Sequence, residues 1–264
     1  MRWEANTGEC GKYPWPMRLN TSALKTMVAL GTLAVATIVT QSPASASGGF
    51  SPDVSSVNEN THALWIWSWI AAGVVGVFTA ILILWPVFFH RKKNEEFPRQ
   101  TQYNVPVEVA YTVIPFIIVA VLFFYTAKAE SKITHIDKTP AAHTIHVNAI
   151  QWSWQFTYED AAAKPTVTGT PDQTPVLVLP VGEKVHFDLD SNDVVHGFWI
   201  PEFMIQMQTL PGVTNHIEFT ANKIGEFPGR CNILCGRAHS QMLFKVKVVS
   251  PADYETYINS VKVA

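Results

Sequence analysis

Two long runs without a charged residue constrain the fold of this chain more than any other feature. The first run extends from Ala63 to Phe89, and the second extends from Val109 to Ala127 with Pro115 inside it. About 20 consecutive apolar residues are enough to cross the hydrocarbon core of a membrane, so each run predicts a spanning helix. The alternative is a pair of buried core helices in a soluble protein. The low content of charged residues, 15%, favours the membrane interpretation.

The residues around the two runs predict their orientation. The basic segment His90-Arg91-Lys92-Lys93 follows the first run directly, and loops rich in Lys and Arg remain on the cytoplasmic side of a membrane. We therefore predict a transmembrane helical hairpin with spans at about 63–89 and 107–127, a cytoplasmic loop at 90–106 and both termini outside. Tryptophans, which favour the membrane–water interface, lie near both ends of the first run: Trp65, Trp67, Trp69 and Trp85.

Residues 1–46 have the features of a secretory signal peptide. Four basic residues precede an apolar run from Met27 to Val39, and an Ala-x-Ala site ends at Ala46. This order of segments is typical of signal peptides. The alternative, a first membrane span, would need a longer apolar run. We expect cleavage after Ala46, which removes Cys10 and leaves 47–62 as a short outer segment.

Beyond the second run and a linker at 128–138, the chain changes to short stretches of alternating apolar and polar residues. Turn signals such as Pro211-Gly212 separate these stretches. Regularly spaced short strands of this kind are typical of a β-sandwich or barrel. We predict such a domain at 139–250 and a helix or tail at 251–264. The strands expected are His143–Ile150, Val176–Pro180, Lys184–Asp190, Asn215–Thr220 and Leu243–Val249.

The segment from Cys231 to Met242 concentrates the side chains that bind soft metals. It contains two thiols, the imidazole of His239 and the thioether of Met242. Thiolate and thioether sulfur select copper, zinc or iron–sulfur clusters over hard cations. The part with Cys235 resembles the ligand loop of a one-copper blue-copper protein, but Cys231 adds a second thiol that could bridge two coppers. A disulfide between the two cysteines is the alternative for an extracytoplasmic domain.

Two further features surround this segment. We expect Gly225, Gly229 and Gly236 to provide tight turns. A second imidazole is expected from His196, which follows a predicted strand and lies among apolar residues. We interpret the remaining histidines as surface or packing residues: His62, His90, His135, His143, His146, His186 and His216.

From Ala63 to its C-terminus the chain resembles subunit II of a heme–copper cytochrome c oxidase. The first matching piece is the start of the second span, Asn104 to Pro115, and the next are Gln151-Trp152-Ser153-Trp154 and Asp193-Val194-Val195-His196. The last and most specific piece is Cys231-x-x-x-Cys235-Gly236-x-x-His239-x-x-Met242. The resemblance implies that the β domain is a cupredoxin-like Greek-key sandwich.

The resemblance also implies a binuclear copper A centre with two copper ions. Cys231 and Cys235 would bridge the coppers, and His196 and His239 would each bind one of them. Met242 and the backbone carbonyl of Ile233 would be weak axial ligands. Two shared thiolates allow one electron to delocalise over both ions, so the geometry changes little on reduction.

The family's role would make this chain the subunit that accepts electrons from a c-type cytochrome and passes them to the hemes of subunit I. That subunit reduces oxygen to water and pumps protons, so no catalytic acid, base or nucleophile is expected here. Trp152 corresponds to the residue where electrons arrive, and ordinary strand packing is the alternative. Glu108 corresponds to the carboxylate at a proton-channel entrance, and a residue that merely reaches the interface is the alternative. The implied location is a bacterial plasma membrane with the copper domain on the outer face.

The net charge gives no reason to expect nucleic acid as a partner, since it is only −2. From Lys128 onward the chain has 11 Lys and Arg against 14 Asp and Glu. This mild acidic excess suits a basic cytochrome, because complementary fields raise encounter rates.

Several positions depart from the family pattern. Ile233 stands where the family has a glutamate that reaches a magnesium ion at the boundary with subunit I, so magnesium binding is not expected through this side chain. Gln206, Gln208 and Val213 replace a lysine, an aspartate and an arginine, and Ser153 replaces an aromatic residue. These changes leave the copper ligands in place.

Three other functions can be weighed against this one. A membrane-anchored copper-delivery protein would have a thioredoxin-like domain and one anchor, unlike the β pattern and two spans here. The quinol-oxidising relative of subunit II lacks the thiols of Cys231 and Cys235. Nitrous oxide reductase shares the dicopper domain but is a larger soluble chain.

Overall fold

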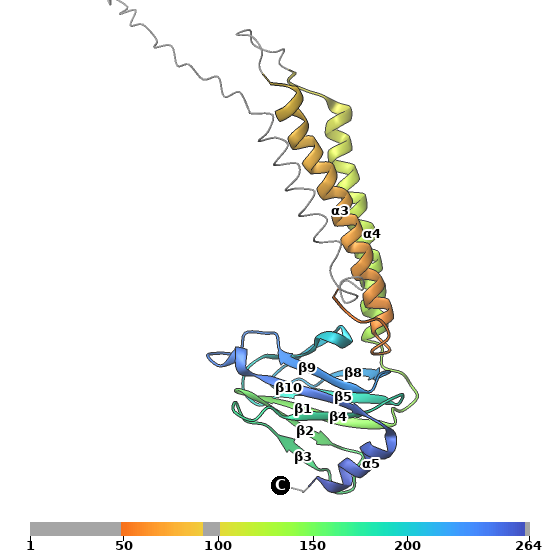
Figure 1. The fold of residues 1–264 in the computed structure, drawn as a ribbon, viewed down its shortest axis with the longest axis vertical. Helices are drawn as coiled ribbons and strands as arrows, with labels where there is room; N and C mark the ends of the chain where they lie inside the picture. The colour runs from red at the N-terminus through yellow and green to blue at the C-terminus, as the bar shows by residue number, and fades with distance from the viewer. Residues whose placement is uncertain (1–48, 92–100, 262–264) are drawn as a thin grey trace, which may run out of the picture. The chain divides into compact units, whose positions relative to one another are not determined.

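The computed structural model describes residues 49–91 and 101–261 (Figure 1). The predicted signal peptide, 1–46, lies outside the described residues, as does most of the predicted cytoplasmic loop. Two long helices come first, α3 (Asn58–Phe89) and α4 (Val105–Ile133), and a short helix, α5 (Pro251–Ser260), comes last. The strands between them are β1 (His143–Ile150), β2 (Ser153–Tyr158), β3 (Thr166–Thr168), β4 (Val176–Pro180), β5 (Lys184–Ser191), β6 (His196–Ile200), β7 (Ile205–Thr209), β8 (Asn215–Thr220), β9 (Gly225–Cys231) and β10 (Leu243–Val249).

Helices α3 and α4 form the hairpin that the apolar runs predict. Both are long and apolar enough to cross a membrane, with candidate spans at Thr61–Phe89 and Val105–Ile133. The α4 helix begins after Asn104, whose side chain accepts a hydrogen bond from the Val107 amide. Both helices extend beyond the predicted spans, because an apolar run marks only the part suited to lipid. At the end of α4 the helix continues through the charged residues Lys128, Glu130 and Lys132.

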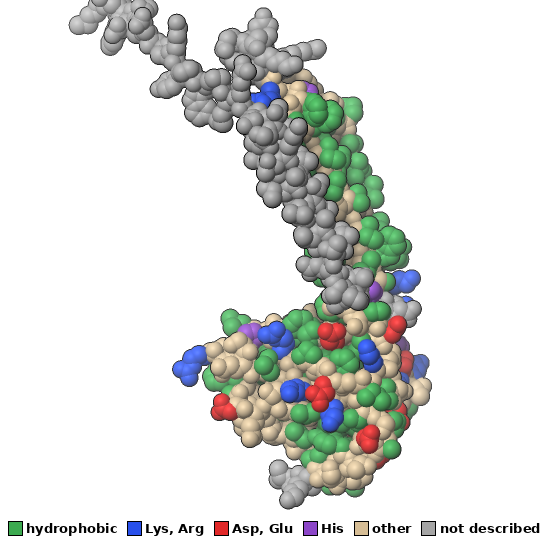
Figure 2. Space-filling view, viewed as in Figure 1, with side chains coloured by type: hydrophobic (Ala, Val, Ile, Leu, Met, Phe, Trp, Pro, Cys, Tyr) green, Lys and Arg blue, Asp and Glu red, His purple; other side chains and the backbone are tan. Residues whose placement is uncertain are grey.

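The hairpin exposes its apolar side chains rather than burying them (Figure 2). No residue is buried in the most apolar stretch of either helix, and Phe116 and Phe123 are 74% and 72% exposed. A soluble protein does not leave an apolar surface of this extent in water. The described helices are therefore not core helices of this chain, which excludes that alternative, and their exposed apolar surface suits lipid or other membrane helices.

The β domain consists of two five-stranded sheets. Their strand orders are β3-β2-β1-β5-β8 and β4-β10-β9-β6-β7. The pairs β1–β5 and β4–β10 are parallel, and the other pairs are antiparallel. Strict alternation in β5 and β10 turns every second side chain into the core, as the sequence pattern requires. The five predicted strands and the terminal helix are confirmed, and so is the predicted fold class of a two-helix hairpin followed by a cupredoxin-like sandwich.

Five strands were not predicted, and β9 shows why. It contains two glycines and Pro228, which are depleted in strands. The structure tolerates Pro228 because β6 pairs with β9 only at Arg230 and Cys231. On the side of β9 that faces β6, no strand is paired with Pro228. The N–H that proline lacks is therefore not needed for a hydrogen bond there.

An aromatic cluster fills the core between the sheets. The rings of Phe198 and Phe244 stack with centroids 4.9 Å apart, and Trp154 meets both of them edge-on. Gly229 makes room for this cluster, since a Cβ atom there would overlap the Phe244 ring. The prediction that Gly229 provides a turn is wrong: it lies inside β9, where only a residue without a side chain fits beneath Phe244.

The segment that leads into α3, residues 54–58, packs onto the β domain, and we call it the strap; its last residue, Asn58, is the first residue of α3. Val54 is buried, and Asn58 donates hydrogen bonds from its amide to the carbonyls of Glu202 and Ser51. The strap backbone also bonds to the end of β8, through Ser56 N–H to the Thr220 carbonyl at 2.9 Å. The predicted outer segment at 47–62 is thus in part a component of the sandwich.

His143 links β1 to neighbouring loops through two carboxylates. Its Nδ1 lies 2.6 Å from Asp160 and its Nε2 lies 2.7 Å from Glu183. The hydrogen bond with Asp160 raises the pKa of His143, although burial opposes the charge. Burial also opposes the charge on Asp160, but the hydrogen bond with His143, the charge of that ring and hydrogen bonds from backbone N–H groups together lower the pKa of that carboxyl.

The His143 pair predicts a pH-dependent stability. A raised histidine pKa contributes stability that is fully present below the unfolded value of about 6.5 and is lost as pH rises through the folded pKa. We expect His143→Gln to lower the free energy of unfolding more at about pH 5.5 than at about pH 8.5. Chemical unfolding at both pH values measures this difference. The exposed His135 provides the control, because His135→Gln should change stability little at either pH; an equal loss for His143→Gln at both values would contradict the prediction.

Candidate metal centre

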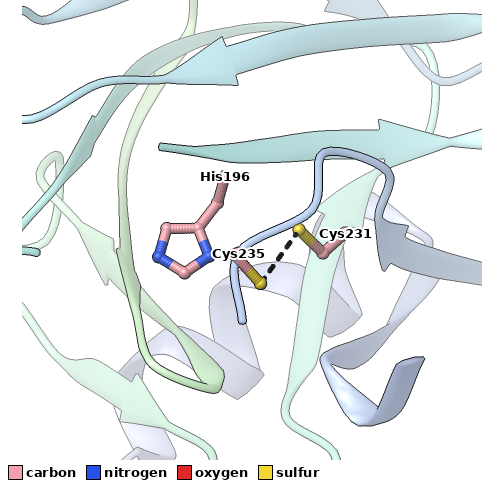
Figure 3. A group of neighbouring side chains, drawn as sticks. All are labelled: His196, Cys231 and Cys235. Atoms are coloured by element: carbon pink, nitrogen blue, oxygen red, sulfur yellow. Dashed lines mark hydrogen bonds between the residues drawn. The ribbon is translucent and has the colours of Figure 1, made fainter. Parts of the chain in front are cut away.

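The predicted metal-binding side chains come from the start of β6, the end of β9 and the loop between β9 and β10, all in the sheet with the order β4-β10-β9-β6-β7. Cys231 ends β9, His239 begins a short 3-10 helix (His239–Gln241), and Met242 immediately precedes β10. His196 begins β6, and four residues separate it from the end of β5, which matches its predicted place after a strand. Figure 3 shows His196, Cys231 and Cys235 as neighbours, with a dashed line between the two cysteine sulfurs.

The sulfur and nitrogen atoms of this set lie close together. The two cysteine sulfurs are 3.7 Å apart, and Cys235 Sγ lies 3.8 Å from Met242 Sδ. His239 Nδ1 is 3.6 Å from Cys235 Sγ, and the Ile233 carbonyl oxygen is 3.2 Å from Cys231 Sγ. Both cysteines are free thiols, so the disulfide alternative does not describe this structure. All six predicted ligands are therefore brought to one place.

The imidazole of His196 is held with one nitrogen toward the sulfurs. Its Nδ1 lies 3.1 Å from Met242 Sδ, and its Nε2 lies 2.8 Å from Asp193 Oδ1. Asp193 is held in turn by the backbone N–H groups of Val194 and Gln151. A histidine whose outer nitrogen bonds to a carboxylate is the usual arrangement for a metal ligand, because the carboxylate orients the ring. Asp193 was not singled out as a site residue from the sequence, although it is three residues before His196.

The two thiols differ in acidity. Burial opposes ionisation of Cys231, but hydrogen bonds to His196 and to the backbone of Gly197 outweigh it and lower the pKa of this thiol to about 6. Burial and the charge on Cys231 raise the pKa of Cys235 to about 12. Without metal the pair therefore holds one thiolate near neutral pH. Metal ions bind thiolates, so copper binding would displace the second proton.

These donors fit a copper centre. Two thiolates, two imidazoles and a thioether form a soft set that suits copper, and the surrounding core excludes water. Cys231, Cys235 and Met242 are all at most 4% exposed. The chemistry of the donor set, rather than its shape alone, points to copper.

Comparison with known proteins agrees with this set. A family model described as "Cytochrome C oxidase subunit II, periplasmic domain" matches residues 143–249. A probable cytochrome c oxidase subunit 2 of Streptomyces coelicolor is 41% identical over 234 residues, which cover 74% of this chain and 73% of that protein. This chain belongs to the cytochrome c oxidase subunit II family. A probable subunit 2 of Nocardia farcinica is 35% identical over 275 residues, covering 80% of this chain and 72% of that one.

A solved structure is also similar to the β domain of this subunit II. It is the periplasmic domain of cytochrome oxidase subunit II from Bradyrhizobium japonicum, 28% identical with a TM-score of 0.44. The match covers 48% of this chain and 99% of that one.

The side chains at the positions that depart from the family pattern do not fit a magnesium ion. Magnesium prefers oxygen ligands, carboxylates above all. Ile233 instead packs its side chain beside Gly197, where a Cβ atom would lie 3.0 Å from Ile233 Cγ1. Gln206 accepts a hydrogen bond from the Asn232 amide, and Val213 is exposed. These side chains offer no carboxylate, so the expectation that Ile233 does not bind magnesium stands as a prediction.

Trp152 touches the backbone of the metal loop. Its indole N–H donates a hydrogen bond to the Cys235 carbonyl at 3.2 Å, and the Gln151 amide donates to the same oxygen at 2.8 Å. Gly236, with φ at +125°, lies against the indole ring. The ring is partly exposed, so it connects solvent to a predicted copper ligand through one hydrogen bond.

We expect Gly236→Ala to disturb this contact. The Cβ atom of the alanine would lie 3.0 Å from Trp152 Nε1. The residue would also have to keep a positive φ, which alanine rarely adopts. The expected loss of stability is about 1–3 kcal/mol, with a change in tryptophan fluorescence. Gly212 is a matched control, because its φ is +73° but a Cβ atom added there would meet no other atom within 4 Å. If Gly212→Ala were as damaging, the Trp152 contact would not be responsible.

Glu108 has a local structural role at the start of α4. Its carboxylate accepts a hydrogen bond from the Asn104 N–H at 3.0 Å, and Asn104 in turn caps the helix. Both bonds satisfy groups that the helix start would otherwise leave unpaired. The role of Glu108 at a proton-channel entrance remains a prediction that this geometry neither requires nor opposes.

Proposed function

We propose that this chain accepts electrons from a c-type cytochrome and passes them to the hemes of oxidase subunit I. The single observation that carries the proposal is the convergence of two free thiols, two imidazoles and Met242 at one place in a subunit II, where His196 of β6 meets the loop between β9 and β10. Such donors would hold the two coppers of a copper A centre, which supplies one-electron chemistry with little change in geometry.

Each ligand has a role in this proposal. Cys231 and Cys235 would bridge the coppers, and His196 and His239 would bind one each. Met242 and the Ile233 carbonyl would be weak axial ligands. With copper bound, Nε2–H of His196 would donate to Asp193, which would leave Nδ1 as the nitrogen that binds the metal.

We further propose that Trp152 is where electrons arrive from the cytochrome. Its partial exposure and its hydrogen bond to the Cys235 carbonyl support this role. Strand packing alone would explain the buried neighbour Trp154 but not an indole at the surface of the ligand loop. Glu108 is proposed as the entrance of a proton path, on the weaker ground of its place at the end of a span.

The proposed location is a bacterial plasma membrane with the copper domain on the outer face. The two spans and the basic segment between them support this orientation. A copper-delivery role is the alternative, and the all-β domain and second span argue against it. The proposed domain boundaries follow the sequence: signal peptide 1–46, hairpin 63–127, copper domain 139–250 and tail 251–264.

Electron acceptance can be tested in the oxidase complex with Trp152→Phe. We expect the variant to retain its copper but to oxidise a reduced c-type cytochrome at least tenfold more slowly, measured by heme absorbance under stopped flow. Trp67→Phe, on the exposed surface of α3, is the control and should leave this rate unchanged. A wild-type complex that did not oxidise the cytochrome would contradict the proposed function, and an unaffected rate in Trp152→Phe would contradict the role of Trp152 alone.

A further inference from the structure

A second group of metal-binding side chains lies on the outer face of the first sheet. His186 and Asp188 lie on β5, and His216 lies directly opposite Asp188 on β8. Their ligand atoms all lie within 4.8 Å of one another. The alternating residues Val185, Phe187 and Leu189 point into the core, so this group is on the opposite side of the sheet from the core that adjoins the copper loop. The sequence pattern alone does not group these histidines and indicates only surface or packing roles for them.

The three side chains converge on one carboxylate oxygen. Asp188 Oδ1 lies 3.1 Å from His186 Nε2 and 2.6 Å from His216 Nδ1. A carboxylate oxygen only accepts hydrogen bonds, so both rings direct an N–H at it. A divalent ion with ligands at about 2.0–2.2 Å needs donor atoms spaced much as these are. Such an ion would take the place of the protons that His186 Nε2 and His216 Nδ1 now direct at Asp188 Oδ1.

A further carboxylate orients one of the rings from outside. Glu218 Oε1 lies 3.0 Å from His186 Nδ1, and the Glu218 side chain is only 6% exposed. Glu218 is fixed in turn by Lys184, 3.6 Å away, and by the backbone N–H of Asp137. Metal-bound histidines usually donate their second N–H to such a carboxylate, which is the arrangement seen here. Glu218 thus holds the His186 ring in place, in addition to the three side chains that would bind the ion.

We propose that His186, Asp188 and His216 form a second metal site for a divalent ion of the zinc class. Two imidazoles favour zinc, copper or nickel over magnesium and calcium. Three protein ligands leave a coordination position for water. His216 is half exposed and Asp188 is 30% exposed, so the ion would exchange with solvent. The bound ion would fasten β5 to β8 beside Asp137, in the linker that follows α4.

The test uses the full chain in detergent without a histidine tag, in a Cys231→Ser, Cys235→Ser background that removes the thiols. Zn²⁺ binding is measured by equilibrium dialysis, and Co²⁺ absorbance reports the ligand geometry. We expect one Zn²⁺ per chain and a rise in Tm with Zn²⁺ concentration, because an ion that binds only the folded state stabilises it. His216→Asn should abolish both effects. Glu218→Gln should weaken Zn²⁺ binding about 10–100-fold while keeping the three ligands.

His135 is the matched control. It also lies near a carboxylate, 3.7 Å from Asp137, but it does not belong to either of the described groups of side chains that could hold a metal ion. His135→Asn should bind Zn²⁺ as the parent does. Circular dichroism in EDTA checks that each variant folds. The proposal is overturned if the parent binds no Zn²⁺, or if folded His216→Asn binds it as tightly as the parent. Neither result bears on the copper centre, because the background contains no thiol there.

Discussion

Replacing Cys231 with serine should abolish the proposed dicopper centre. The full chain, purified in detergent and loaded with copper, is expected to bind two coppers and to be purple. A serine hydroxyl is a poor ligand for copper, and the remaining thiolate of Cys235 cannot complete a two-thiolate bridge. We expect Cys231→Ser to lose the purple colour and to hold fewer than two coppers, measured by elemental analysis and visible absorbance.

Leu234→Ala is the control for this experiment. Leu234 lies between the cysteines but is 81% exposed, so its removal should leave the copper content unchanged. A serine variant that remained purple with two coppers would overturn the ligand assignment. A colourless wild-type protein with one zinc would overturn the copper centre itself. The full chain is preferable to a fragment from Thr139, since such a fragment would lack the strap.

Replacing Trp154 with alanine should cause the largest loss of stability. Trp154 is fully buried, contacts the rings of Phe198 and Phe244, and directs its N–H toward the Met242 carbonyl at 3.5 Å. Removing a buried tryptophan side chain typically costs about 3–5 kcal/mol, a large part of the total stability of a domain. Chemical unfolding measures the change. Copper affinity should fall as well, because the Trp154 ring also packs edge-on near His196.

Two variants provide the comparison for Trp154→Ala. Trp154→Phe keeps an aromatic ring in the cluster and should lose much less stability. Trp199→Ala removes a tryptophan that is only partly buried in β6 and should also lose less. If Trp154→Ala cost no more than about 1 kcal/mol, an ordinary value for a point substitution, the cluster would not be the centre of the core.

The sequence predicted those parts of the fold whose residues act locally. Strict alternation in Leu243–Val249 specifies β10 because each side chain needs only to face inward or outward. The spacing of Cys235, His239 and Met242 likewise predicted a compact site, because a short loop keeps its members together. The apolar runs predicted the hairpin for the same reason.

The remaining features depend on contacts between distant residues. Pro228 lies in a strand only because β6 stops pairing before it. The strap contacts the Phe203 carbonyl across 148 positions of sequence, and no local pattern around Val54 indicates this. Asp193 and the group of His186, Asp188 and His216 depend on hydrogen bonds that form only when strands are in register. Sequence patterns specify elements well, but they do not specify which elements meet.

The strap also has a consequence for the order in which the molecule is assembled. It precedes the hairpin in the chain, whereas the strands that receive it follow the hairpin. A growing chain therefore exposes Ser56 and Asn58 long before their partners at Thr220 and Glu202 exist. The sandwich can be completed only after synthesis has passed both helices and most of the strands, which makes docking of the strap a late event. The β domain thus remains incomplete until two segments that the hairpin separates in the sequence come together.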